Sequence, residues 1–143
     1  AAGRAGERFA VRNSGASVVV EGCGSNGCEY MTGGVAVILG RIGANFGAGM
    51  TGGMAYIYDP KATAEDLINA ESLVTCAVSH PHWEAQLRGL IEAHVVETGS
   101  RHGERILANW ADERANFLQV CPKEMLVHLA HPLSDEALKV PAE

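Results

Sequence analysis

Six residues from Gly22 to Gly27 match the G-x-G-x-x-G pattern of dinucleotide-binding loops. A segment with strand propensity, SVVVE, precedes them. A dinucleotide site also needs a helix directly after the glycines, because the amino end of that helix holds the pyrophosphate. Here the next residues are CEYMTGG, and no acidic residue stands about 20 positions further on to bind the ribose hydroxyls. The pattern therefore favours a glycine-rich turn over a nucleotide site.

Four cysteines could serve as metal ligands: Cys23, Cys28, Cys76 and Cys121. The first two have C-x₄-C spacing, and the other two lie far along the chain. A tetrahedral zinc site or an iron–sulfur cluster needs donors that converge, and this spacing does not predict convergence. We expect buried thiols. Four cysteines in a chain of 143 residues are too few for a disulfide framework, so we expect a reducing, cytoplasmic compartment.

Two histidine pairs, His80-Pro81-His82 and His128-x-x-His131, could also contribute to a metal site. Each pair stands beside a proline in a polar segment without an evident third or fourth ligand, so we expect these side chains to face solvent. The chain has no phosphate-binding P-loop, no strand–turn–helix nucleophile elbow and no pair of catalytic carboxylates. We therefore predict no catalytic, cofactor-binding or metal-binding residue.

The glycine-rich turn belongs to a repeat. The residues MTGG occur twice, in EYMTGGVAVILG and AGMTGGMAYIYD, and Gly34 and Gly53 lie 53 − 34 = 19 residues apart. A further step of 19 residues reaches Gly15, in RNSGASVVVEG. Each copy joins a glycine corner to a run of high strand propensity. A period near 20 residues predicts a mainly β solenoid, whereas a flexible linker, the alternative, would not keep its apolar runs in register.

Stacking of the repeats predicts two ladders of side chains, Val18 with Val37 and Tyr56, and Val19 with Ile38 and Ile57. Strand side chains alternate between faces, so only one ladder can point inward, and Tyr56 favours the outer position for its own ladder. At each turn of the repeat the backbone must adopt a positive φ or pack closely against a neighbouring coil. Glycine permits both because it has no Cβ atom. We expect positive φ at Gly34 and Gly53.

The character of the chain changes at Asp59-Pro60. Fourteen of the 17 glycines precede this point and all six histidines follow it. Helical spacing of apolar residues in WEAQLRGLIEAHVVETGS predicts a helix that ends at Gly99, and Ser100 can cap a second helix. The segment NFLQVCP predicts a short strand. We therefore expect residues 1–59 to form the repeats and residues 60–143 to form a mainly helical tail that packs on them.

Charge and hydropathy exclude two classes of partner. The net charge of −6 falls entirely after residue 59, and no Lys/Arg cluster is present, so binding to nucleic acid is not expected. No apolar run reaches the roughly 18 residues that would cross a membrane, and no signal peptide opens the chain.

The segments AAGRAGERFAVRNSGA and EYMTGGVAVILGRIGANFGAGMTGGMAYIYD closely resemble the C-terminal region of the large (α) subunit of glutamate synthase, the GXGXG domain. LRGLIEAHVVETGS, ILANW and VCPKEM are similar to the segments that close that subunit. The resemblance covers residues 1 to about 126 and includes both the repeats and the tail. Residues 127–143 carry no motif that adds to it.

The resemblance implies a right-handed parallel β-helix within a large enzyme. That enzyme transfers the amide nitrogen of glutamine to 2-oxoglutarate and yields two glutamates. It uses FMN, a 3Fe–4S cluster, and electrons from NADPH through a small FAD-containing subunit or from ferredoxin. The catalytic cysteine, flavin and cluster motifs of the family match no positions here. The implied role is therefore a scaffold that holds the other domains of the large subunit in place.

Two other functions fit the repeat. One is a free-standing β-helix assembly protein similar to the β-helical component of formylmethanofuran dehydrogenase, and the other is a nucleotide-binding enzyme that uses Gly22–Gly27. The tail favours glutamate synthase. Residues from Phe9 to Val20 already have the character of an ordinary repeat without a polar cap. We therefore expect the open end of the first repeat to self-associate in the isolated chain.

Overall fold

A computed structural model describes residues 9–10, 12–69, 71 and 73–126. The strands are β1 (Ser14–Val20), β2 (Thr32–Ile38), β3 (Gly52–Tyr58), β4 (Leu73–Ala77) and β5 (Phe117–Pro122). The helices are α1 (Pro81–Thr98), α2 (Arg101–Ala108) and α3 (Trp110–Glu113), and three single 3₁₀ turns lie at Glu65–Leu67, Arg114–Asn116 and Lys123–Met125. The strands form one sheet in the order β1-β2-β3-β5-β4.

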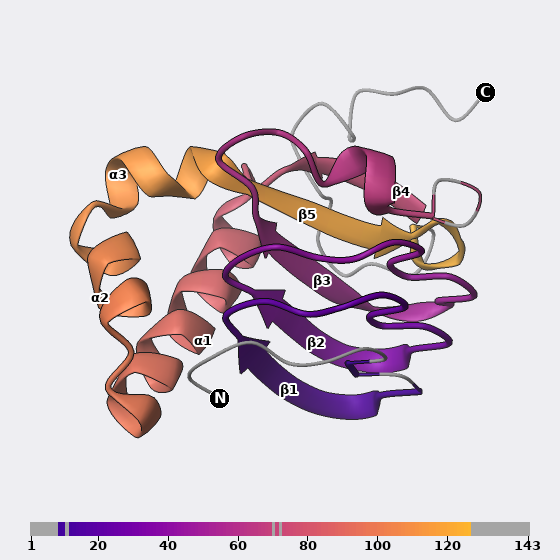
Figure 1. Ribbon diagram of the computed structural model, residues 1–143, viewed down its shortest axis with the longest axis horizontal. Helices are drawn as coiled ribbons and strands as arrows, with labels where there is room; N and C mark the ends of the chain where they lie inside the picture. Colours follow the sequence, from indigo (N-terminus) through magenta and orange to yellow (C-terminus); the bar gives the residue numbers. More distant parts are fainter. Residues whose placement is uncertain (1–8, 11, 70, 72, 127–143) are drawn as a thin grey trace.

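The fold is mixed α/β, and the prediction of a mainly β, right-handed parallel β-helix with a solenoid architecture is wrong. Strands β1, β2 and β3 are parallel neighbours, but β5 adds antiparallel to β3 and pairs on its other side with β4. Each repeat supplies a single strand, and the connecting residues 21–31 and 39–51 form turns and bends rather than further strands. Figure 1 shows these connections on one face of an open sheet and α1 beside the other.

The repeat nevertheless positions the three parallel strands. Val37 pairs with Tyr56 and Ile38 with Ile57, as predicted. In β1 the partners are Val19 and Val20 instead of Val18 and Val19, a shift of one residue. The shift arises because the pairing is irregular between Ser14 and Ser17, where β1 contains one more residue than β2. A bulge of this kind changes the spacing within a repeat that is regular in sequence.

The sheet carries one core cluster on each face. Val20, Ile38 and Ile57 pack with the connecting loops, for example against Phe46 and Met50. The ladder that contains Val37 and Tyr56 points away from the loops, as predicted. Val37 and Tyr56 are fully buried, in a cluster with the α1 residues Trp83, Leu87 and Ile91. Burial of large apolar side chains on both faces is the main stabilising contribution to such a sheet.

The expectations for the tail are largely confirmed. Helix α1 ends at Gly99, which has φ 67°, and the Ser100 side chain caps α2 by accepting from the Gly103 amide. The strand over NFLQVCP is β5, whereas β4 was not predicted. The division of the chain after residue 59 stays a prediction. Among the described residues, no helix combines the length and hydropathy needed to cross a bilayer.

Candidate functional site

The G-x-G-x-x-G residues lie in the turns between β1 and β2, and no helix follows them. Their backbone groups pair with the equivalent residues of the next repeat. The Cys23 amide donates to the Arg41 carbonyl at 2.9 Å, the Asn26 amide donates to the Ala44 carbonyl at 2.8 Å, and the Gly24 carbonyl accepts from Gly43. A pyrophosphate site would need such amides to be free and aimed at the ligand. The residues from Gly22 to Gly27 therefore hold two repeats together, and the Cys23 and Asn26 amides are not available to a phosphate.

The four cysteines are free thiols in the interior. Cys23, Cys28 and Cys121 are fully buried, and Cys76 is half-buried. Burial raises the pKa of the Cys76 and Cys121 thiols to about 11, and burial and the neighbouring Cys23 raise the pKa of Cys28 further. Protonated thiols are poor nucleophiles and poor metal ligands. Within the described part of the chain, no group of three or more His, Cys, Asp or Glu residues could hold a metal ion, so this donor set does not fit an iron–sulfur cluster.

The first histidine pair lies at the start of α1. The Nδ1 atom of His80 accepts a hydrogen bond from the His82 amide at 3.1 Å, which caps the helix. His82 is exposed, as predicted, and its ring meets the edge of Trp83 with centroids 4.5 Å apart. His80 is therefore a capping residue and only half-exposed. His128 and His131 lie outside the described residues.

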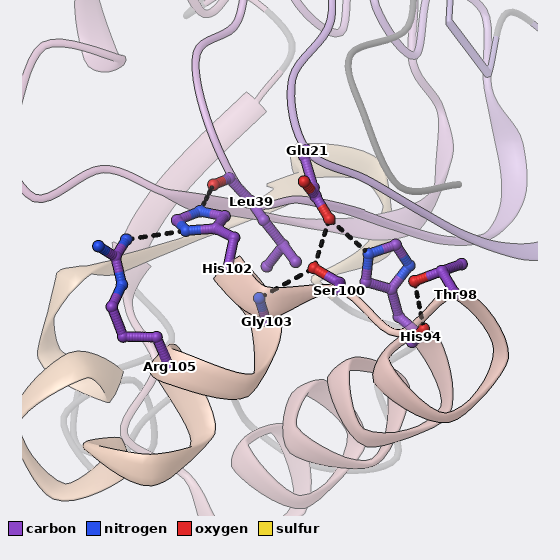
Figure 2. A network of polar contacts seen from close by, with 8 residues as sticks. All are labelled: Glu21, Leu39, His94, Thr98, Ser100, His102, Gly103 and Arg105. Carbon is purple, nitrogen blue, oxygen red and sulfur yellow. Dashed lines mark hydrogen bonds and ion pairs between the residues drawn. The ribbon is translucent and has the colours of Figure 1, made fainter.

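A partly buried polar network joins the first repeat to the helices, and the sequence did not predict it (Figure 2). The Nε2 atom of His94 lies 3.1 Å from Oε2 of Glu21, and the Ser100 hydroxyl donates to the same oxygen. Ser100 also accepts from the Gly103 amide at 3.0 Å. The exposed fraction is 4% for His94 and 5% for Ser100, whereas the Glu21 side chain is 20% exposed, so the carboxylate lies at the edge of the buried region. Glu21 and His94 are 73 residues apart, and no local pattern links them.

Serine, histidine and a carboxylate are the components of a hydrolytic triad, but their arrangement here differs. In a triad the histidine lies between the serine and the carboxylate, so that it can take the hydroxyl proton. Here the Glu21 carboxylate lies between Ser100 and His94 and accepts from both. The Ser100 oxygen is also occupied by the Gly103 amide. This network, the Glu21–His94–Ser100 contact, therefore fastens the turn between α1 and α2 to the residue that follows β1.

The contact changes the acidity of Glu21. Partial burial would by itself raise the pKa of this carboxyl group. Hydrogen bonds from Ser100 and His94, with the electrostatic interactions with His94 and His102, outweigh that effect and leave the pKa below its usual value of 4.5. Glu21 is therefore held in its ionised form, as an acceptor.

A second set of contacts extends the network toward β2. The Nε2 atom of His102 donates to the Leu39 carbonyl, and the Nδ1 atom accepts from the Arg105 guanidinium at 2.9 Å (Figure 2). Leu39 directly follows β2 and Glu21 directly follows β1. The two contacts therefore connect the ends of two neighbouring repeats to α2 and its cap.

The fold and its contacts together define a class of protein. It is a domain of repeats with glycine at the turns, and its polar groups form hydrogen bonds within the domain. The chain belongs to the GXGXG motif family, whose model matches residues 1–123. It is 63% identical over 133 residues to the glutamate synthase (NADPH) large chain of Azospirillum brasilense, a match that covers 93% of this chain and 9% of that protein.

Two further relatives are also glutamate synthases, and each matches most of this chain. The chain is 52% identical over 120 residues to ferredoxin-dependent glutamate synthase 2 of Synechocystis sp., covering 84% of the chain and 8% of that protein. It is 50% identical over 122 residues to glutamate synthase (NADH) of Schizosaccharomyces pombe, covering 85% and 6%. The resemblance to the glutamate synthase large subunit is thereby confirmed. The chain spans less than a tenth of the length of these relatives.

Proposed function

We propose that this chain is the C-terminal scaffold segment of a glutamate synthase large subunit and carries no catalytic residue. The observation that carries the proposal is that the candidate groups make internal contacts. The Cys23 and Asn26 amides bond to the next repeat, and Glu21, His94 and Ser100 bond to one another. The repeats provide stacked parallel strands, and the helices are fastened to them by buried contacts. A segment built in this way resists deformation and can hold attached domains at fixed separations.

The activity belongs to the whole enzyme under this proposal: glutamine and 2-oxoglutarate are converted to two glutamates. FMN, the 3Fe–4S cluster and the FAD-containing partner that takes electrons from NADPH would be bound by other regions or by other chains. The free cysteines fit the reducing, cytoplasmic location expected from the sequence, which is part of the same proposal. The remaining domains of the large subunit are its expected partners.

Titration of the isolated chain with FMN and with NADPH tests the first half of the proposal. We expect no saturable binding at micromolar concentrations. Saturable binding that Gly24→Val abolishes would contradict the proposal and restore the nucleotide-binding alternative.

The second half is tested in the complete enzyme with Gly34→Val, which distorts a repeat corner, and Gly15→Val, which adds the same side chain in open space. We expect Gly34→Val to lower glutamate synthesis more than the glutaminase reaction measured alone, because a distorted scaffold separates regions that each remain folded. Equal activity of the two variants would contradict a scaffold role.

A further inference from the structure

A cavity of about 570 Å³ lies beyond the carboxyl ends of the three parallel strands. Its wall includes Glu21 after β1, residues 39–42 after β2, residues 57–61 at the end of β3, and His102 of α2. In open sheets with parallel strands, the crevice at this end is a recurrent binding position. None of the contacts assigned above to the scaffold role fills this cavity.

The outer wall of the cavity is fixed by Asp59. Its carboxylate accepts hydrogen bonds from the Thr63 amide at 3.0 Å and from the Ala64 amide at 3.0 Å. Its own amide donates to the Asn116 carbonyl at 2.7 Å. The loop after β3 is therefore fixed by hydrogen bonds within the loop and by one to Asn116. The cavity is formed before any partner binds. A preformed cavity binds with a smaller loss of conformational entropy.

Most polar groups of the wall are already engaged. Both ring nitrogens of His102 are used, and the Tyr58 hydroxyl donates to Glu113. The exceptions are Arg41 and Lys61, two exposed side chains for which the described part of the chain provides no hydrogen bond or ion pair. The cavity therefore presents two unpaired positive charges, whereas its carboxylates are bound by donors of the chain itself.

The rest of the wall is apolar. Pro60 is exposed and Leu67 is half-buried, and beneath them lie the buried side chains of Ile42 and Ile57. Apolar surface next to two cations complements an apolar side chain that stands beside a carboxylate.

We propose that the cavity receives a peptide segment of the same polypeptide from outside these 143 residues, with an apolar side chain in the cavity and an adjacent Asp or Glu at Arg41 and Lys61. The proposal rests on the scaffold role proposed above and names the surface that performs it. The chain accounts for 9% of the length of its Azospirillum relative, so many segments outside it are candidates.

A tethered segment fits these groups better than a free small anion does. Arg41 and Lys61 are exposed, flexible side chains, and exposed ion pairs contribute little to affinity. A free ligand must also overcome its loss of translational freedom. A segment of the same polypeptide has a high effective concentration, so the weak exposed pairs are sufficient to select where it docks.

Zero-length carbodiimide coupling of the complete enzyme tests the proposal, because it joins a lysine amine to a carboxylate only where the two are in contact. We expect peptide mass spectrometry to find Lys61 joined to an Asp or Glu outside residues 1–143. Lys61→Arg keeps the charge but has no primary amine to couple, so it should remove this product. Products of Lys61 confined to residues 1–143, including Asp135 and Glu136, would overturn the proposal.

A charge reversal provides the second measurement. The double variant Arg41→Glu/Lys61→Glu should increase the rate of limited proteolysis between this domain and the rest of the enzyme roughly two- to tenfold. The increase is modest because exposed ion pairs contribute little free energy. The matched control is Arg88→Glu/Lys123→Glu, which reverses two exposed charges outside the cavity. Equal rates for the two variants would overturn the docking proposal. The scaffold role fails separately, if Gly34→Val and Gly15→Val have equal activity.

Discussion

Left-handed backbone recurs at equivalent residues of the repeats, whether or not glycine is present. Gly34 and Gly53 have φ values of 82° and 83°, as the repeat predicted. Cys28 and Tyr30, with φ 56° and 55°, precede Gly47 and Gly49 by 19 residues each, and those glycines also have positive φ. The sequence could indicate the corners that carry glycine in both copies. It could not indicate Cys28 or Tyr30, because only the surrounding contacts force a residue with a Cβ into this conformation.

The corner at Gly34 should not tolerate a side chain. A Cβ atom there would lie 2.3 Å from the carbonyl oxygen of Ala16, in addition to the strain of a positive φ. We expect Gly34→Val to lower the free energy of unfolding by at least about 1–3 kcal/mol. Gly15→Val is the matched control, because nothing lies within 4 Å of its Cβ position. Denaturant unfolding of both variants measures the difference, and equal midpoints would show that the corner is not restrictive.

Glu21 should make stability depend on pH in the acid range. Its pKa is lower in the folded state than its ordinary value of 4.5. The corresponding stabilisation is therefore complete above the unfolded pKa and is lost as the pH falls through the folded pKa. We expect the difference in unfolding free energy between the wild-type chain and Glu21→Gln to shrink as the pH falls from 4.5, the ordinary pKa of this carboxyl group, toward its lower folded value. A difference that grows on acidification would mean that the folded pKa is raised instead.

At the scale of elements, local sequence signals predicted the helices. Contacts between residues far apart in the sequence could not be predicted from those signals. Gly99 and Ser100 adjoin in sequence, and both perform the capping roles that their residue types favour. Strand β4 was missed because its residues, Leu73–Ala77, are too few to give a clear alternation. The Glu21–His94–Ser100 contact was missed because its members meet only after the sheet and α1 pack together.

Ser100 should therefore stabilise more than an ordinary helix cap. It accepts from the Gly103 amide and also donates to the Glu21 carboxylate. We expect Ser100→Ala to cost about 1–3 kcal/mol, a cap plus a charge-assisted hydrogen bond. Ser79→Ala, at an exposed serine, should stay within about 0.5 kcal/mol. A double-mutant cycle with Glu21→Gln separates the two terms, and zero coupling would mean that Ser100 acts on α2 alone.

At the scale of the molecule, the period predicted three stacked strands but not the architecture. Parallel pairing of β1, β2 and β3 follows from the repeat, and their shared side-chain ladders explain the register. The sheet then departs from a solenoid because β5, from a segment without the repeat, takes the place beside β3. The edge of β3 was free to accept either another repeat or this strand. Only the packing of the tail decides between them, and a period carries no information about that packing.

The other side of the sheet supports the last prediction, self-association of the isolated chain. Among the described residues β1 pairs with β2 alone, so it is an edge strand, and its residues from Ser14 to Ser17 are exposed. An edge strand leaves backbone donors and acceptors available to a second copy. Light scattering over a concentration series should show dimers in the wild-type chain. Ser17→Lys should weaken them, because a charge on the edge opposes pairing, whereas Val96→Lys, on an exposed position of α1, should not. A monomer at every concentration, with slow amide exchange from Val18 to Val20, would show that the edge is already protected.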